Sequence, residues 1–197
     1  MDLWIGTSNK GKMSEFTLLT TKEKPGLALK GLKDLPSYVQ PPENGKTFVE
    51  NARIKAKSLK AMKSGQWVMA EDSGLEVDAL GNLPGIHSAR YAGPKAQDSE
   101  NVAKLLKMMQ IKAVSDRKAR FVCTIVAYDP AGNEHIFQGS MPGKIASKPA
   151  GLLGFGYDPV FIPDGQEKTL AELGPGFKVQ NSHRTQAYKE LLSKISV

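Results

Sequence analysis

An apolar run that ends in acidic residues constrains this chain more than any other stretch. The run Trp67–Ala70 has the character of a buried strand, and Glu71, Asp72, Ser73 and Gly74 follow it directly. In an α/β protein such a strand delivers reactive side chains to the carboxyl edge of the sheet, where ligands bind. Two adjacent carboxylates can hold a divalent metal, or one can hold the metal while the other accepts a proton. The alternative is a strand that ends in an ordinary polar turn, because Asp, Ser and Gly are common in turns.

Length and composition indicate a globular chain with one sizeable domain or two lobes. The chain has 197 residues, of which 40% are hydrophobic and 24% charged, which is enough for a sizeable core and too apolar for a disordered chain. No apolar run approaches the roughly 20 residues that span a bilayer. The N-terminus shows no basic and apolar leader, and a lone Cys123 cannot form an internal disulfide. We therefore expect a cytoplasmic protein with no membrane partner.

The formal net charge of +7 is compatible with binding to nucleic acid or to a small phosphorylated substrate. The alternative is that the charge only keeps the protein soluble. The lysines and arginines are scattered along the chain, and aromatic residues make up only 7% of it. No stacking motif typical of RNA-binding domains is present. The pattern favours a small phosphorylated ligand at a local site over a nucleic-acid surface.

The N-terminal segment predicts a strand, a polar loop and a helix. Residues 3–6 form the expected strand, and the helix is expected from about Lys10 to Thr20. The polar segment Thr7–Lys12 joins them and runs into the start of the helix, and it carries Gly11 and Lys12. Backbone N–H groups and the helix dipole favour an anion at such a helix start, and the lysine adds a full charge. The alternative is a capped helix with exposed lysines, since the segment is not a Walker P-loop.

A second helix is expected from Thr47 to about Lys63. Thr47 and Glu50 fit a capping box in which Glu50 reaches back to the Thr47 N–H. Lys55 falls within the apolar stripe that runs from Phe48 to Met62. A lysine in such a stripe commonly keeps its ammonium in water while its stem is buried. The alternative is that Lys55 points into a binding site and meets an anion.

The C-terminal half predicts further elements and one glycine-rich loop. In the segment 148–159, glycines allow a close approach of backbone to a ligand, and Phe155 could present a ring for stacking. The alternative is a mobile surface loop. We expect helices at 98–110 and from 183 onward, strands at 120–128, 134–139 and 160–162, and a short helical turn at 169–173 that Gly174 stops.

The last helix begins with an unusual charge pattern. Ser182 is a natural N-cap, so His183 and Arg184 lie in the first helical turn. Cations there oppose the helix dipole. Because positions that break a local rule are often functional, we expect a role other than helix stability.

Several segments together resemble the inosine triphosphate pyrophosphatase family, and the resemblance runs from about Leu3 to Leu192. Any one of them would be weak, but all of them occur in the family's order and spacing. They are Thr7–Lys12, Thr47–Ala52, Ala70–Leu75, Ser88–Gly93, Gly154–Pro159 and Ser182–Arg184.

The resemblance implies a magnesium-dependent hydrolase acting on acid anhydrides. It would convert the non-standard purine nucleotides ITP, dITP and XTP to the monophosphate and pyrophosphate, and so cleanse the nucleotide pool. The implied fold is an elongated α/β structure with a long mixed central sheet flanked by helices. Two lobes, with an active-site cleft between them, would form one domain over residues 1–197 and not two independent ones. The family also implies a homodimer.

The resemblance assigns roles residue by residue. Asp72 would be the catalytic acid, as metal ligand and proton acceptor. Glu43 would be the second metal ligand, and Glu71 a further one, although many relatives carry Asp at that position. Many relatives also carry acidic residues just before Lys178, where this chain has Pro175–Phe177. Implied substrate contacts are Thr7, Ser8, Asn9, Lys10, Gly11, Lys12 and Lys55 for the phosphates, Ser73, and Phe155, Gly156, Tyr157, Asp158, Lys178, His183 and Arg184 for the base.

These roles are physically sensible. A magnesium triphosphate needs cations for its charge and carboxylates for its metal. Donors such as Lys178, His183 and Arg184 suit the 6-keto oxygen of the purine, where adenine has an amino group, and each mispaired donor costs about 1–3 kcal/mol. Two alternatives remain open: a related pyrophosphatase for other modified nucleotides, and a non-catalytic nucleotide-binding or nucleic-acid-binding protein.

Overall fold

The computed structural model describes residues 1–196 and shows an α/β fold with one mixed sheet. The strands are β1 (Asp2–Ile5), β2 (Ala28–Lys30), β3 (Trp67–Val77), β4 (Leu83–Pro84), β5 (Lys118–Tyr128), β6 (Glu134–Ile145) and β7 (Phe161–Pro163). The α-helices are α1 (Lys10–Glu23), α2 (Phe48–Met62), α3 (Asp98–Ile111), α4 (Leu170–Asn181) and α5 (His183–Lys194). Short 3₁₀ helices are η1 (Leu32–Asp34), η2 (Asp78–Leu80), η3 (Gly85–Arg90) and η4 (Asp158–Val160).

The sheet combines parallel and antiparallel pairs. Its order is β2-β1-β3-β5-β6-β7, and β4 pairs with β3 outside this path. β1 runs parallel to β2 and to β3, whereas β4 is antiparallel to β3 and β7 is antiparallel to β6. The expected class, an α/β fold with a mixed sheet flanked by helices, is confirmed. Within the described part of the chain, no helix is long and apolar enough to cross a bilayer.

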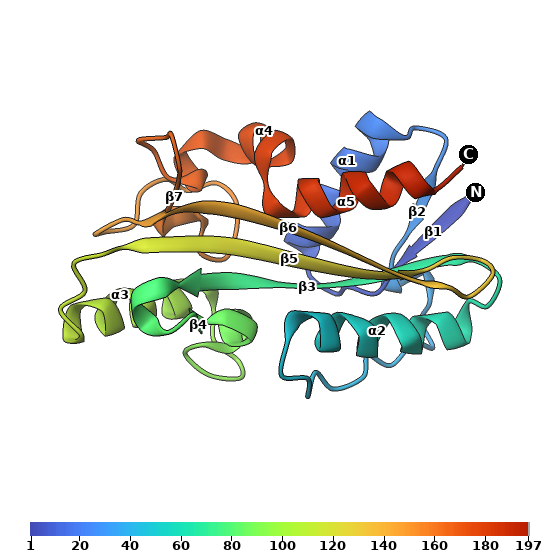
Figure 1. The fold of residues 1–197 in the computed structure, drawn as a ribbon, viewed down its shortest axis with the longest axis horizontal. Helices are drawn as coiled ribbons and strands as arrows, with labels where there is room; N and C mark the ends of the chain where they lie inside the picture. Colours follow the sequence, from blue (N-terminus) through green and yellow to red (C-terminus); the bar gives the residue numbers. More distant parts are fainter. Residues whose placement is uncertain (197) are drawn as a thin grey trace. The chain divides into compact units, whose positions relative to one another are not determined.

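The chain divides into two compact units. Unit 1 comprises Met1–Asp72, Cys123–Gly139 and the C-terminal part from Arg184, and unit 2 comprises Ser73–Val122 and Ser140–His183. In unit 1, α2 covers one face of the strands, and α1 and α5 lie on the other (Figure 1).

Unit 1 is held together by apolar contacts on both faces of its strands. Ala52, Ala56 and Leu59 on the buried side of α2 pack with Trp4 and Val68 of the strands. The helical spacing of those α2 residues explains why the helix presents this face to the sheet.

The other two helices of unit 1 are joined at their buried faces. The ring of Phe16 in α1 meets the ring of Tyr188 in α5 edge to face, with centroids 4.8 Å apart. The hydroxyls of Thr20 and Tyr188 share a hydrogen bond of 2.7 Å. The side chains that α1 and α5 send toward the sheet are therefore fixed relative to each other.

Unit 2 has its own apolar core. Leu75 of β3, Leu105 of α3 and Phe161 of β7 are fully buried in it, together with Val160 and Leu170. Figure 1 shows α3 and α4 on opposite sides of the strands of this unit.

The acidic pair does not mark the end of a strand, so that prediction is wrong. β3 continues from Trp67 through Glu71 and Asp72 to Val77, and its last residues pair with β4. Alternating side chains of a strand point to opposite faces, so Glu71 and Asp72 face different helices. The turn-forming residues after them do not break the strand because pairing with β4 supplies hydrogen-bond partners for its end.

Other elements match the predictions with shifted boundaries. α1 continues to Glu23, and β6 continues to Ile145. The helical turn expected to stop at Gly174 resumes beyond it, because Gly174 adopts φ 79° and forms a kink inside α4. Thr47 caps α2 as predicted by accepting the Glu50 N–H, but the Glu50 carboxylate accepts the N–H of Lys46 instead of that of Thr47.

Candidate functional site

The predicted phosphate loop is an exposed turn that leads from β1 into α1. Asn9 is the N-cap of α1, and its Oδ1 accepts the Lys12 N–H at 3.0 Å. Thr7 Oγ1 accepts the Asn9 N–H at 3.2 Å, and Ser8 Oγ donates to Gln40 Oε1 at 3.2 Å. The predicted strand, loop and helix are confirmed. The helix start can still attract an anion, because a single side-chain cap satisfies only one of the orphan N–H groups.

The side chain of Lys12 turns to the strand behind the loop. Its Nζ lies 2.8 Å from Glu71 Oε1, and Arg184 Nη2 lies 3.5 Å from the same oxygen. Arg184 also pairs with Glu15 of α1. Burial would raise the pKa of Glu71, but the positive charges, Lys12 first and Arg184 next, lower it to about 2. Glu71 is therefore an ionised carboxylate that forms ion pairs with Lys12 and Arg184.

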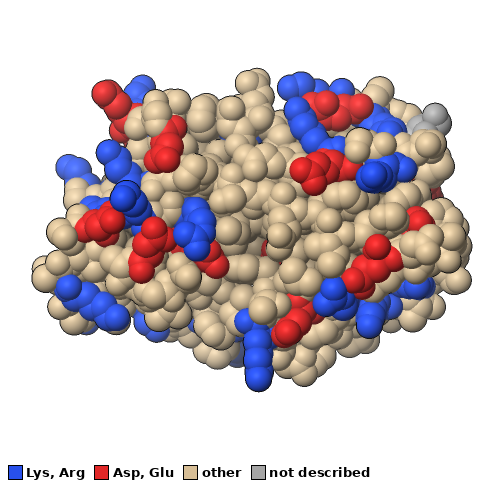
Figure 2. Space-filling model, viewed as in Figure 1, with Lys and Arg blue, Asp and Glu red and all other residues tan. Residues whose placement is uncertain are grey.

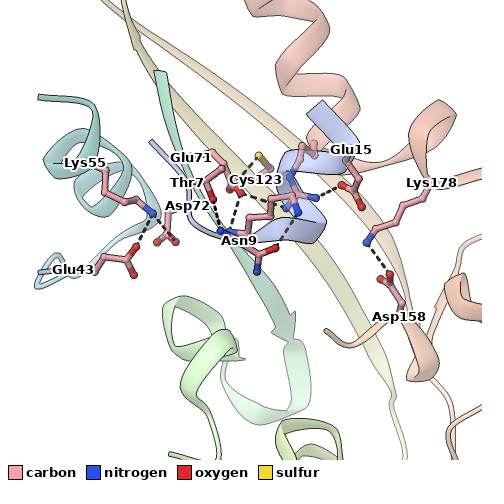
Figure 3. Close-up of polar contacts among 12 residues, drawn as sticks. Thr7, Asn9, Glu15, Glu43, Lys55, Glu71, Asp72, Cys123, Asp158 and Lys178 are labelled. Carbon is pink, nitrogen blue, oxygen red and sulfur yellow. Dashed lines mark hydrogen bonds and ion pairs between the residues drawn. The ribbon is translucent and has the colours of Figure 1, made fainter. Parts of the chain in front are cut away.

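On the opposite face of β3, Asp72 belongs to a second cluster (Figure 3). Lys55 Nζ donates to Glu43 Oε1 at 2.6 Å and lies 3.9 Å from Asp72 Oδ1. Only 4% of Lys55 is exposed, so its ammonium is not in water and the snorkelling alternative is wrong. Burial opposes the charge of Lys55, but Asp72 and Glu43 outweigh it and raise its pKa.

The electrostatics of Asp72 differ from those of its neighbour in the strand. Burial, the largest influence, raises the pKa of Asp72 to about 6, and the charges of Glu71 and Glu43 push in the same direction. Lys55 and Lys12 only partly offset this. A carboxyl group that titrates near neutral pH is suited to accept and release a proton.

The donor set fits a magnesium ion in part. Glu43 and Asp72 converge on one cation, the Lys55 ammonium, and both supply the hard oxygen ligands that magnesium prefers. Glu71 does not fit, because it faces the other side of β3 and is paired there. Among residues 1–196 no group of three His, Cys, Asp or Glu side chains could hold a metal by itself. An ion held by two carboxylates would complete its coordination with water and substrate phosphate, as magnesium often does.

Unit 2 brings together three of the residues predicted for the base. Asp158 Oδ2 accepts a hydrogen bond from Lys178 Nζ at 2.8 Å (Figure 3). The same oxygen accepts the Phe155 N–H at 3.0 Å. Lys178 Nζ also lies 4.1 Å from the centre of the Phe155 ring. Asp158 and Lys178 are both buried, at 1% and 5% exposure. The arrangement offers an aromatic face next to a lysine whose orientation a carboxylate fixes.

The glycine-rich loop that carries Phe155 is shaped by its glycines and by anchors at both sides. Gly154 has φ 83°, and a Cβ there would lie 2.2 Å from Asp158 Oδ2, so only glycine lets the carboxylate come this close. The Gly156 N–H donates to Asp98 at the start of α3 at 2.7 Å. Tyr157 is buried, and its hydroxyl donates to the Ser88 carbonyl at 2.8 Å. The alternative of a mobile loop is not supported by these contacts.

The two basic residues at the start of α5 belong to different units. His183 is buried in unit 2, where its ring stacks on Phe121 with centroids 5.0 Å apart. Arg184 is buried in unit 1 and bonds to Glu15 and Glu71. Ser182 lies between α4 and α5 in extended conformation, as expected of an N-cap.

Sequence reasoning missed two buried polar residues of unit 1, Glu15 and Asn51. Both lie at helical spacing within the buried faces of their helices, Glu15 beside Phe16 and Asn51 four residues before Lys55. The signal that singled out Lys55, a polar residue inside an apolar stripe, would have found both.

The remaining predicted residues are placed as follows. Ser73 follows Asp72 in β3, and Lys10 and Gly11 form the first turn of α1, with Lys10 exposed. The motif residues Ala89 and Ala92 are held from α3 by Asn101, whose side chain bonds both of their backbones. This asparagine gives the 88–93 segment a fixed path within unit 2.

Figure 2 shows charges of both signs on one face of the protein. On the face drawn in Figure 2, the described acidic and basic side chains alternate, and no long track of one sign is visible there. The expectation that the net positive charge serves a local site more than a nucleic-acid surface stays a prediction.

Comparisons with known proteins cover nearly the whole chain. A sequence model of the Ham1 family matches residues 3–194. A Bdellovibrio bacteriovorus protein named dITP/XTP pyrophosphatase is 58% identical over 195 residues, which cover 99% of this chain and 98% of the relative. A Bacillus licheniformis protein of the same name is 43% identical over 187 residues, or 95% and 94% of the two chains. The solved structure of the Staphylococcus aureus Ham1 protein superimposes with a TM-score of 0.84 at 38% identity, and 98% of this chain and 97% of that one are covered.

Proposed function

This chain belongs to the Ham1 family, and from that premise we propose that it hydrolyses non-standard purine nucleoside triphosphates. The products are the nucleoside monophosphate and pyrophosphate, and the substrates are ITP, dITP and XTP. The names of the relatives, dITP/XTP pyrophosphatase, support the reaction and the substrate class. The observation that carries the proposal is the cluster of Asp72, Glu43 and Lys55, in which two carboxylates and a lysine converge inside unit 1.

Asp72 is the residue that handles the proton. Water adds at a phosphorus of the α,β-anhydride, the bond to the bridging oxygen breaks, and Asp72 takes the proton that the water loses. A pKa of about 6 leaves Asp72 ionised at neutral pH and still basic enough for this task. Lys55, held by Glu43, supplies positive charge next to this carboxylate.

Magnesium is the cofactor that the donor set supports. Asp72 and Glu43 would hold it, and when bound it would neutralise phosphate charge and favour the departure of pyrophosphate. The loop Thr7–Lys12 and the start of α1 bind the triphosphate through backbone N–H groups and the exposed Lys10.

Recognition of the base falls to unit 2. The Phe155 ring stacks on the purine, and Lys178, oriented by Asp158, donates to the 6-keto oxygen. Adenine presents an amino group at that position, so ATP leaves a buried donor unpaired and is a poor substrate. His183 adds a polar edge to this recognition, whereas Arg184 acts from unit 1, where it holds Glu71 in place.

The test is product identification. The protein is incubated with magnesium and ITP, XTP, dITP, GTP or ATP, and the released phosphate is identified. We expect pyrophosphate from the first three and little from ATP or GTP. Release of orthophosphate, or equal rates with all five nucleotides, would contradict the proposal.

The assembly and location are part of the same proposal. We expect a homodimer in a reducing cytoplasm, where the buried Cys123 stays a thiol because burial raises its pKa. Sedimentation equilibrium gives the mass of the assembly, and a monomeric mass at micromolar concentration would contradict this part.

A further inference from the structure

One asparagine links the two carboxylate-bearing segments of unit 1. Asn51 lies in α2 and is fully buried, at 0% exposure. Its Nδ2 donates to Asp72 Oδ2 at 3.1 Å, and its Oδ1 accepts the Gly45 N–H at 2.9 Å. Gly45 is two residues beyond Glu43 in the loop before α2. A single carboxamide therefore joins β3 to the loop that carries the other carboxylate.

The partners leave only one orientation for this carboxamide. A backbone N–H can only donate and an ionised carboxylate can only accept, so Gly45 must face the oxygen and Asp72 the nitrogen. Aspartate at position 51 would set a second carboxylate against Asp72. Leucine has nearly the same shape but would leave both partners without a hydrogen bond in a buried place. Among side chains of this size, asparagine alone supplies one donor and one acceptor here.

The loop is packed against Asn51 without room for a side chain. A Cβ at Gly45 would lie 2.7 Å from Asn51 Oδ1 and 2.9 Å from its backbone nitrogen. A larger residue at this position would therefore push the loop away from α2. Glu43, which this loop carries, would move with it.

Asn51 and Lys55 act on Asp72 from the same helix face. They are four residues apart in α2, so they are stacked one turn apart. Asn51 holds Oδ2 of Asp72, while Lys55 faces Oδ1 at 3.9 Å and bonds to Glu43 at 2.6 Å. The rotation of the Asp72 carboxylate and the position of the Glu43 loop are thus set by two neighbouring side chains.

We propose that Asn51 is a positioning residue for the reaction, which fixes the rotation of the Asp72 carboxylate and keeps the Glu43 loop beside it. It neither touches the substrate nor transfers a proton. The inference rests on the proposed function in so far as Asp72 and Glu43 are the carboxylates that carry out the chemistry. Outer-shell partners of this kind commonly change metal affinity or activity by about 10- to 100-fold.

The test uses two variants and a matched control in the full-length protein. Asn51→Leu removes both hydrogen bonds, and Gly45→Ala disturbs the same contact from the loop side while Asn51 stays in place. The control is Asn101→Leu in unit 2, because Asn101 is also buried, at 2% exposure, and also forms hydrogen bonds through both ends of its side chain, in this case with the backbone of Ala92 and Ala89. Circular dichroism and thermal melts establish that each variant is folded.

The first readout is kinetic. With ITP and saturating magnesium, we expect kcat to fall about 30-fold in Asn51→Leu and about 10-fold in Gly45→Ala, while KM for ITP changes less than threefold. The control should keep kcat within threefold, even if its melting temperature falls as much. An equal loss of kcat in the control would mean that any buried asparagine has this effect and would overturn the inference.

The second readout does not depend on turnover. Free Mn²⁺ is followed by electron paramagnetic resonance during titration of the nucleotide-free protein, and we expect about 10-fold weaker binding in Asn51→Leu than in the parent or the control. If the parent binds Mn²⁺ but releases no pyrophosphate from ITP, the proposed function fails, and these affinities alone decide the role of Asn51. Parent-like Mn²⁺ affinity together with parent-like kcat in Asn51→Leu overturns the inference. A parent that neither binds Mn²⁺ nor hydrolyses ITP overturns both.

Discussion

The charged clusters of unit 1 and unit 2 are built in different ways. In unit 1, carboxylates of β3 meet cations from three helices, Lys12 of α1, Lys55 of α2 and Arg184 of α5. In unit 2, the buried pair of Asp158 and Lys178 lies next to the aromatic ring of Phe155. The first arrangement is suited to a highly charged group, because positive and negative charges are arranged over a wide area. The second is suited to a flat neutral group with one polar edge.

The two units also differ in the backbone elements that carry these residues. In unit 1, Asp72 stands on β3 and Lys55 on α2, so their positions follow from regular structure, whereas Glu43 stands on the loop before α2. The pair in unit 2 depends on a loop in which Gly154 takes a positive φ to let Asp158 approach. Regular elements thus hold Asp72 and Lys55, which are expected to act in the chemistry, whereas a shaped loop holds Phe155, which is expected to stack on the base. The comparison predicts that changes in unit 1 lower the rate with every nucleotide, whereas changes in unit 2 alter the choice between nucleotides.

The largest effect is expected for Asp72→Asn. The amide cannot take the proton from water and is a poorer metal ligand, so kcat with ITP should fall by at least about 10³-fold. The fold should survive because the amide has nearly the same shape. Steady-state kinetics with a circular dichroism spectrum checks both parts, and turnover near the parent rate would remove Asp72 from the chemistry.

The next effect is expected for Lys55→Met, which keeps the buried stem and removes the charge. We expect kcat/KM for ITP to fall about 10- to 100-fold, because the lysine orders Glu43 and places positive charge beside Asp72. Lys63→Met is a matched control at the C-terminal end of α2, where the ammonium lies over the Trp4 ring, 3.7 Å from its centre. Equal activities of Lys55→Met and the parent would contradict a functional role for this cluster.

A smaller and different effect is expected for Lys178→Met. Loss of the donor should reduce the preference for ITP over ATP by about 10-fold, while kcat at saturating ITP changes less than threefold. This variant leaves a buried carboxylate at Asp158 without its lysine, which costs stability. The double variant Lys178→Met with Asp158→Asn removes that imbalance and should show the same loss of preference. A fall in kcat without a change in preference would contradict the assigned role.

The smallest effect is expected on the stability of the fold, and it again concerns Asp72 of unit 1. The folded-state pKa of Asp72 is raised to about 6, above the usual value of an aspartate, so the native state binds the extra proton. The contribution of this group to stability is therefore present at low pH and is lost as the pH rises through 6. Asp72→Asn should raise the free energy of unfolding by about 1–3 kcal/mol at pH 8, and the gain should shrink toward pH 4. Urea denaturation at both pH values checks this, and a pH-independent difference would contradict it.

The sequence predicted the elements better than the contacts. Apolar runs and capping residues located the strand before the phosphate loop, the helix after Thr47 and the strands β5 and β6. It failed at Glu71 and Asp72, because a strand and a strand end look alike until the pairing with β4 is known. The two carboxylates were therefore expected side by side, whereas the pleat turns them to opposite faces.

The residues of the site were predictable where a local rule was broken. Lys55 stood out in the sequence because it interrupts an apolar stripe. The structure explains this position, because the Lys55 ammonium is buried between Glu43 and Asp72. The pairing of Lys178 with Asp158 could not be predicted, because it joins residues 20 positions apart through a kink at Gly174. Asn51 was missed because an uncharged side chain on a helix face costs less to bury than a charge and so breaks the pattern less clearly, although Asn51 lies four residues before Lys55 on the same buried face.

The division of roles between the two units is tested most directly by one pair of variants. We propose to measure kcat/KM for ITP and for ATP in Lys55→Met and Lys178→Met under the same conditions. The account predicts that Lys55→Met lowers both values by a similar factor, so that the ratio of ITP to ATP stays within threefold of the parent. It predicts that Lys178→Met lowers this ratio about 10-fold. A ratio that changes as much in Lys55→Met as in Lys178→Met would contradict the account.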